Sequence, residues 1–127
     1  MNDYRIGFIG AGNMSQALIA GLLDSASVSA EHLSAVDLVP TALTALKERG
    51  ILTGVKLPLA VQERDFIFLG IKPQVADSVL PALADTLAPG QVVVSMMAGV
   101  ETASIEQYIG HDTPVVRVMP QTLVRLR

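Results

Sequence analysis

The sequence contains no cysteine and no tryptophan, and only 4% of its residues are aromatic. Without cysteine, disulfide bonds and thiolate metal sites are excluded. The two histidines, His32 and His111, lie far apart and show no ligand spacing, so no metal site is predicted. Lysine and arginine form no cluster and the net charge is −3, which argues against a nucleic-acid-binding surface. A small neutral or anionic ligand fits this composition better.

Long hydrophobic runs are also missing, although the mean hydropathy is +0.48. Glycine, proline or a charged residue interrupts every apolar segment before it reaches the roughly 18 residues that a membrane-spanning helix needs. Residues 1–5 (MNDYR) include an acid where a secretory signal peptide carries basic residues. We therefore expect a cytoplasmic protein that neither spans nor binds a membrane.

The 127 residues are half hydrophobic, which is enough for one domain with one well-buried core. Short β-branched runs alternate with segments of helical period, a pattern typical of a parallel sheet between two layers of helices. We predict a Rossmann-type doubly wound α/β domain over residues 1–120, with a mainly parallel sheet of about six strands and helices on both faces.

The expected elements follow from these runs and from the turn residues between them. The strands are expected at Arg5–Ile9, Leu33–Asp37, Leu52–Val55, Phe66–Leu69, Val92–Ser95 and Val115–Met119. The helices are expected at Met14–Asp24, from Pro40 until Gly50, at Gln74–Leu87 and at Thr102–Ile109, with a brief turn or helix at 59–62. The first helix should pack on the sheet through a face that includes Ala17, Leu18, Gly21 and Leu22.

A glycine-rich segment, residues 10–15 (GAGNMS), joins the first expected strand to the first expected helix. In that context Gly10 permits a sharp turn, and Gly12 has no side chain to hold a pyrophosphate away from the backbone. The helix that follows presents free N–H groups and a positive dipole end to the phosphates. Ser15 replaces the third glycine of the usual fingerprint. The alternative is a tight turn that binds no ligand.

An acid, Asp37, closes the second expected strand 25 residues after Gly12. This is near the spacing of the carboxylate that accepts hydrogen bonds from the adenosine ribose. The next residues, 38–40 (LVP), offer no cation for a 2′-phosphate, which favours an unphosphorylated ribose. The alternative is a helix N-cap or a solvated loop acid, and the sequence leaves both readings open.

Two further segments follow strands at the edge where open α/β sheets place their ligands. Residues 70–74 (GIKPQ) contain Lys72, which can approach a ribose hydroxyl or a nicotinamide, or can lie in water as most lysines do. Residues 95–100 (SMMAGV) contain two methionines that are either cofactor contacts or core filler.

Four motifs in this order and spacing resemble the pyrroline-5-carboxylate reductases: GFIGAGNM at 7–14, FLGIKPQ at 68–74, SMMAGV at 95–100 and VRVMP at 116–120. The resemblance covers nearly the whole chain. It implies an oxidoreductase that reduces 1-pyrroline-5-carboxylate to L-proline with NADPH or NADH, in proline biosynthesis and without a metal. No residue is assigned a catalytic role.

The resemblance also turns the loop residues into expected cofactor contacts. The pyrophosphate would lie against Ile9, Gly10, Ala11, Gly12, Asn13 and Met14, and the spacing adds Asp37 for the ribose. The nicotinamide and its ribose would be bordered by Gly70, Ile71, Lys72, Pro73, Met96, Met97 and Ala98.

The chain departs from the family after Met119-Pro120. Members usually continue with Asn-Thr-Pro and a helical domain that carries the substrate site and the homo-oligomer interface, whereas residues 121–127 read QTLVRLR. We expect residues 121–127 to be a divergent tail that results from a frameshift or another truncation. The chain is then expected to be a cofactor-binding fragment that is inactive alone. The alternatives are another small-substrate NAD(P)-dependent dehydrogenase of the hydroxyacid type, and a non-catalytic dinucleotide-binding module.

Overall fold

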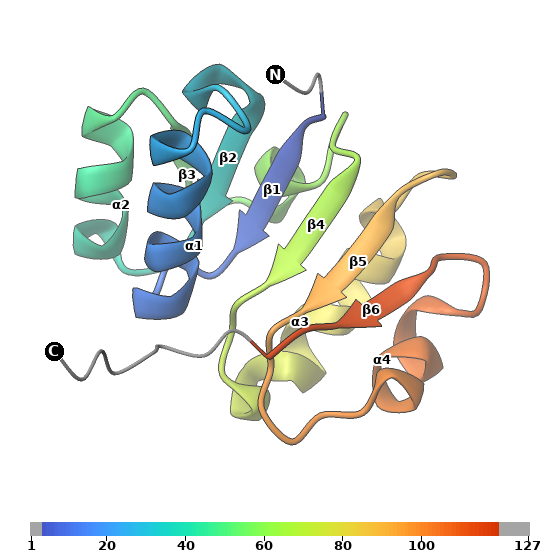
Figure 1. Cartoon of the computed structure of the whole chain (residues 1–127). Coiled ribbons are helices and arrows are strands. Elements are labelled where there is room, and N and C mark those ends of the chain that lie inside the picture. The colour runs from blue at the N-terminus through green and yellow to red at the C-terminus, as the bar shows by residue number, and fades with distance from the viewer. Residues whose placement is uncertain (1–3, 120–127) are drawn as a thin grey trace, which may run out of the picture.

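Six strands pair in parallel, in the order β3-β2-β1-β4-β5-β6, in the computed structural model, which describes residues 4–119 (Figure 1). This is the strand order of a doubly wound Rossmann domain, so the predicted fold class is confirmed. The strands are β1 Ile6–Ile9, β2 Leu33–Val36, β3 Leu52–Gly54, β4 Phe66–Leu69, β5 Val92–Ser95 and β6 Val115–Arg117.

Four α-helices connect these strands and cover the sheet from both sides (Figure 1). Helices α1 and α2 lie on one face, over β1 to β3, and helices α3 and α4 lie on the other face. The helices are α1 Asn13–Asp24, α2 Pro40–Glu48, α3 Ala76–Thr86 and α4 Thr102–Ile109, with short 3₁₀ turns η1 Ala30–His32, η2 Leu57–Ala60 and η3 Pro73–Val75. No helix within residues 4–119 is long and apolar enough to cross a membrane.

The sheet separates two hydrophobic clusters, because successive side chains of a strand point to opposite faces. The first cluster packs α1 and α2 on the sheet and includes Phe8, Ile19, Leu33, Leu43 and Leu46. The second cluster packs η2, α3 and α4 on the opposite face and includes Ile67, Leu69, Leu80, Leu83, Val93 and Ile105.

One region of the sheet has no helix over it among the described residues. It lies on the α1 side of β4, β5 and β6, which face the viewer in Figure 1. There Val116 pairs with Val94 and is 47% exposed, Phe66 and Phe68 are only half-buried, and Tyr4 packs edge-on against Phe66. We call these five residues the open face.

The predicted elements agree with the structure to within a few residues, and β4, β5 and α4 agree at both ends. Three elements differ by two residues, and one of them is the brief turn expected at 59–62, which is η2 at Leu57–Ala60. The helix expected to begin at Gln74 begins at Ala76, after the 3₁₀ turn η3. Pro73 is the first residue of that turn, where the chain winds more tightly than an α-helix. The last strand ends at Arg117 instead of Met119.

The predicted face of α1 was only partly right. Leu18 and Leu22 pack against the first cluster as expected. The helix buries Ser15 and Ile19, while Ala17 and Gly21 are exposed to solvent. Because alanine and glycine carry little hydrophobic surface, Ala17 and Gly21 are poor indicators of which face of the helix is buried. The large apolar side chain of Ile19 decides which face packs on the sheet.

Candidate functional site

The loops that follow β1, β2, β4 and β5 leave the sheet at the same edge, the lower edge in Figure 1. The strand order reverses between β1 and β4, since the chain proceeds from β1 toward β3 on one side and from β4 toward β6 on the other. A doubly wound sheet forms its ligand crevice at such a switch point.

The turn after β1 is pinned to both neighbouring strands. The Gly10 N–H donates to the Val36 carbonyl at 2.9 Å, and the Gly70 N–H donates to the Ile9 carbonyl at 2.8 Å. Gly10 has a φ of +97°, and a Cβ there would lie 2.4 Å from the Gly70 carbonyl oxygen. Conformation and space therefore both require glycine at position 10.

Gly12 is different, because nothing in the described part of the chain requires a glycine there. It is the N-cap of α1, with φ −74° and ψ −173°, an extended conformation open to any residue. A Cβ built on Gly12 meets no protein atom within 4 Å. The space in front of its backbone is therefore free for a ligand.

The first turn of α1 is open to an anion. No side chain caps the helix, and its first turn contains no acidic residue. The first N–H groups of a helix have no partner within the helix, so those of Asn13 and Met14 are available as donors beside Gly12.

At the switch point three residues meet in close contact. A Cβ on Gly70 would lie 2.3 Å from the Ser15 hydroxyl and 3.0 Å from the Met96 methyl group. Ser15 is 1% exposed, and its hydroxyl has no hydrogen-bond partner in the part of the chain that the structure describes. The serine at the third glycine position therefore still lets α1 approach the sheet closely.

Asp37 links two turns of this edge. Its Oδ2 accepts a hydrogen bond from the Ala11 N–H at 2.8 Å, and its Oδ1 accepts one from the Val39 N–H at 2.9 Å. The N-cap of α2 is Val39, which has no side-chain cap, so the N-cap alternative for Asp37 was wrong. The carboxylate instead closes an Asx-turn and holds the glycine turn.

Gln16 is a site residue that the sequence did not single out. Its Nε2 donates to the Ala11 carbonyl at 2.8 Å and to the Ala42 carbonyl at 3.0 Å. The sequence did contain an indication of this role. Gln16 directly follows the glycine-rich segment in the first helical turn, where an amide side chain can reach back to the preceding loop.

The other predicted contacts fall into two groups. The side chains of Ile9, Ala11 and Met97 lie in the hydrophobic core and offer no surface to a ligand. The exposed or partly exposed group lies at the crevice edge and consists of Gly12, Asn13, Met14, Asp37, Gly70, Ile71, Lys72, Pro73, Met96 and Ala98. Within residues 4–119, no group of three or more His, Asp or Glu side chains is placed to hold a metal ion.

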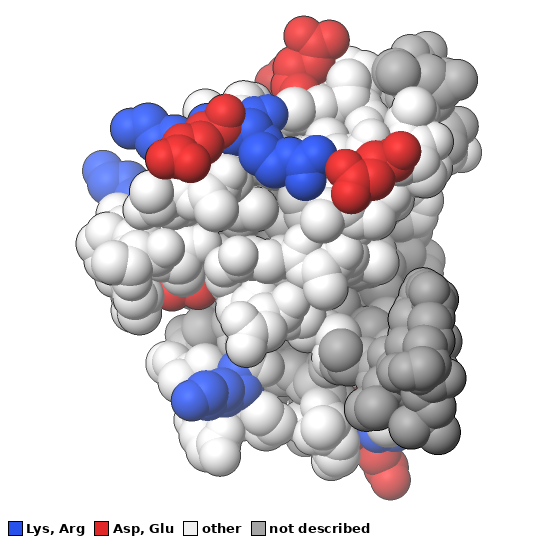
Figure 2. All heavy atoms as spheres, turned by 60° about the vertical axis from the view of Figure 1, so that its left-hand side comes forward, with Lys and Arg blue, Asp and Glu red and all other residues white. Residues whose placement is uncertain are grey.

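Charge is distributed unevenly around the sheet. On the face in Figure 2, acidic and basic side chains gather toward the end that carries the last turns of α1 and α2, where Arg49 bonds Asp24 at 2.9 Å. At that same end of the strands, Arg64 donates to the His32 carbonyl. Burial lowers the pKa of the Arg64 guanidinium, and the charge of Arg5 lowers it further. These cations lie at the edge opposite the crevice.

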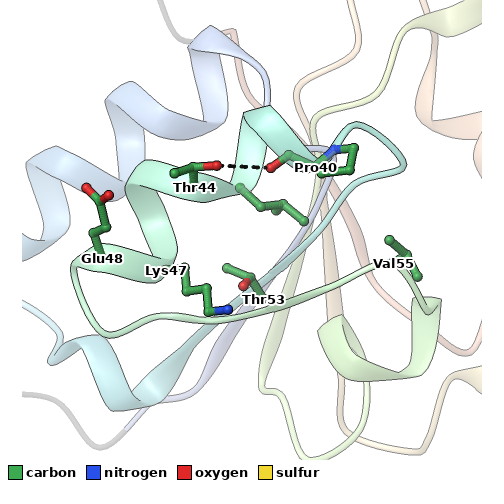
Figure 3. Close-up of a pocket in the computed structure, with 7 residues that line it drawn as sticks. Pro40, Thr44, Lys47, Glu48, Thr53 and Val55 are labelled. Carbon is green, nitrogen blue, oxygen red and sulfur yellow. Dashed lines mark hydrogen bonds between the residues drawn. The ribbon is translucent and has the colours of Figure 1, made fainter.

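A cavity of about 450 Å³ lies between α2 and β3 (Figure 3). One end of the cavity lies near the turn that Asp37 closes. The Asp37 N–H donates to the carbonyl of Gly54, and the residues on either side of Gly54 line the cavity. Its lining residues are Pro40, Leu43, Thr44, Lys47, Glu48, Thr53 and Val55. None of the predicted cofactor contacts is among them.

The strand order, the switch-point crevice and the glycine turn against a helix N-terminus together define a dinucleotide-binding Rossmann domain. Residues 5–99 match the model of the family described as NADP oxidoreductase, coenzyme F420-dependent, and the chain belongs to that family.

The resemblance to pyrroline-5-carboxylate reductases is confirmed. The chain is 42% identical over 130 residues to the pyrroline-5-carboxylate reductase of Pseudomonas aeruginosa, in an alignment that covers 100% of this chain and 46% of that protein. The solved pyrroline-5-carboxylate reductase of Coxiella burnetii matches with a TM-score of 0.89 and 28% identity, over 95% of this chain and 45% of that one.

The Plasmodium falciparum enzyme, solved with NADP bound, supports the fold, with a TM-score of 0.81 and 24% identity over 96% of this chain and 44% of that one. This chain therefore spans less than half the length of these three relatives.

Proposed function

We propose that the chain is the cofactor-binding part of a pyrroline-5-carboxylate reductase, which reduces 1-pyrroline-5-carboxylate to L-proline with NADPH or NADH. The observation that carries this proposal is Gly12, a glycine that the fold does not need but a bound pyrophosphate would. The similarity to reductases of known name supplies the substrate. Because proline biosynthesis acts on soluble metabolites, we also propose a cytoplasmic location.

In this proposal the pyrophosphate is received at Gly12, Asn13 and Met14, and Asp37 faces the adenosine ribose. Ile9, Gly10 and Ala11 shape the turn from within the protein. The nicotinamide end would lie along Gly70, Ile71, Lys72 and Pro73, with Met96 and Ala98 on the neighbouring loop and Met97 beneath them.

When bound, the reduced nicotinamide supplies a hydride to the imine carbon of the substrate. The residues of this chain would hold the cofactor at the crevice and exclude water from the side that they cover. We propose that the substrate site and the homo-oligomer interface belong to the part of the relatives that extends beyond the match. The domain boundary at 120 and the tail 121–127 remain part of this proposal and lie outside the described residues.

A second candidate is a dinucleotide-binding module without catalysis. The observation that favours it is that the predicted site residues within residues 4–119 are cofactor contacts, and none of them is assigned a catalytic role. Both candidates bind the cofactor in the same way and differ in whether the chain reduces the substrate.

Binding is tested by calorimetric titration of NADH and of NADPH into the chain and into Gly12→Val. We expect the wild-type chain to bind and Gly12→Val to lose binding, because the valine would occupy the space of the pyrophosphate. The control is Gly21→Val, since Gly21 is also an exposed glycine of α1, and a Cβ on it would meet no atom within 4 Å. Equal affinity of the wild type and Gly12→Val would show that the pyrophosphate lies elsewhere.

A further inference from the structure

The peptide groups on both sides of Ala11 are held by side chains from other parts of the chain. Asp37 accepts from the Ala11 N–H at 2.8 Å, and Gln16 donates to the Ala11 carbonyl at 2.8 Å. Ala11 itself is fully buried. The glycine turn is thus held at its centre by a carboxylate on one side and by an amide on the other.

The orientation of the Gln16 amide follows from its neighbours. One terminal atom of the side chain lies within hydrogen-bond distance of two carbonyl oxygens, those of Ala11 and Ala42. Only the NH₂ group, with its two hydrogens, can bond both of them, whereas the amide oxygen would be repelled by each. Gln16 is therefore a double donor at this position.

These bonds close a ring of contacts around the first turns of α1 and α2. The ring runs from Ala11 to Asp37 and on to Val39 at the start of α2. The Ala42 N–H donates to the Val39 carbonyl at 3.1 Å, and Gln16 connects Ala42 back to Ala11. The main-chain N–H of Gln16 also donates to the Gly12 carbonyl at 2.9 Å. The glycine turn and the turn after β2 are thereby fixed relative to one another.

We infer that Gln16 is a positioning residue for the dinucleotide: it fixes the glycine turn through Ala11 and ties that turn to α2 through Ala42. The inference rests on the proposed function. Because the Ala11 N–H is already bonded to Asp37, the pyrophosphate is received by the N–H groups of Gly12, Asn13 and Met14. A dinucleotide spans both turns, so their fixed spacing favours it over a ligand that touches only one.

The first measurement needs no cofactor. Amide hydrogen exchange is followed by NMR in the wild-type chain and in Gln16→Met, which keeps the length of the side chain but removes both donors. We expect exchange at the Ala11 N–H to become about tenfold faster while exchange at Phe8 in β1 stays unchanged, because the bonds lost are those of the turn. The control is Gln107→Met on the exposed surface of α4.

The second measurement compares the affinities for NADH and for adenosine, which has no phosphate and therefore reaches only the turn that contains Asp37. We expect Gln16→Met to weaken NADH binding about tenfold and adenosine binding much less, whereas a general loss of stability would weaken both alike. Gln16→Lys restores donors on a long side chain and should restore the protection of Ala11. If Gln16→Met does not fold, Gln16→Ala serves instead, because alanine favours the helix and also lacks the donors.

Unchanged exchange at Ala11 together with an unchanged ratio of NADH to adenosine affinity would overturn the inference. If the wild-type chain binds no dinucleotide at all, the proposed function fails. The exchange measurement then still decides whether Gln16 holds the turn.

Discussion

Ser15 carries a hydroxyl group into a contact where no acceptor is available within residues 4–119. A buried unpaired hydroxyl costs about 1–3 kcal/mol, so the substitution Ser15→Ala should raise the free energy of unfolding by about 1 kcal/mol. The matching rise in melting temperature is about 3–6 °C, measured by circular dichroism. The control, Ser104→Ala, changes an exposed serine of α4 and should leave the melting temperature nearly unchanged. A less stable Ser15→Ala would reveal a buried water bonded to the hydroxyl.

Asp37 should make the chain prefer NADH over NADPH. Its carboxylate repels a 2′-phosphate, and a close unscreened pair of negative charges is worth on the order of tenfold in affinity. Asp37→Ser should reduce or reverse this preference in titrations with both cofactors. A wild-type preference for NADPH, or an unchanged ratio in Asp37→Ser, would remove Asp37 from the ribose site.

Two structural facts refine this titration. Asp37 accepts two backbone hydrogen bonds, so Asp37→Asn serves as a companion variant that removes the charge and keeps one acceptor. Lys56 is an exposed residue two positions after Gly54, whose carbonyl accepts from the Asp37 N–H. Lys56→Ala should weaken NADPH more than NADH if that side chain reaches a 2′-phosphate.

At the scale of elements, α1 ends in a Schellman motif built on a residue poorly suited to it. The Ser27 N–H donates to the Leu22 carbonyl and the Ala26 N–H to the Leu23 carbonyl, which leaves Ala26 with a φ of +57°. This left-handed conformation favours glycine.

We therefore expect Ala26→Gly to raise the free energy of unfolding by about 0.5 kcal/mol, after the greater freedom of glycine in the unfolded chain is counted. The same substitution in the exposed middle of α2, Ala45→Gly, should lower it by about 1 kcal/mol. Urea unfolding of both variants provides the comparison. If the two substitutions destabilise the chain equally, the strain at position 26 is negligible.

The strands could be predicted because they are short apolar runs between turn residues; β4 and β5 begin and end where Phe66–Leu69 and Val92–Ser95 were expected. The glycine turn was predictable for a similar reason, because the strand before it and the helix after it are adjacent to it in the sequence. The bonds of Ala11 with Asp37 and of Gln16 with Ala42 each join residues 26 positions apart. No local pattern encodes such contacts, and they appear only once the turns are placed side by side.

For the molecule as a whole, we expect these 127 residues to reduce no pyrroline-5-carboxylate at a measurable rate, even when they bind cofactor. Holding two reactants at contact distance contributes about 7–11 kcal/mol to lowering a barrier, and the proposal provides a site for only one of them. The assay follows the absorbance of NADH with substrate present, first for this chain and then for a version extended by a relative's remaining half. Comparable rates for the two proteins would mean that the chain carries its own substrate site.

The open face has a related consequence for solubility. Its five residues have no covering helix within residues 4–119, and two of them, Tyr4 and Val116, are about half exposed. Exposed apolar patches of this kind promote association, so the extended version should also remain monodisperse at higher concentration than the short chain.

The two clusters on either side of the sheet follow one another along the chain. The first is built from residues 6–51, with only Phe66, Phe68 and Met96 added later, whereas the second draws mostly on residues 57–115. A ribosome adds roughly 5–20 residues per second, which is slow compared with the formation of helices. The layer of α1 and α2 can therefore assemble on β1 and β2 while the rest is still being translated. When β4 emerges, it meets the finished edge of β1, so the nascent chain offers its most apolar strand a partner from the start.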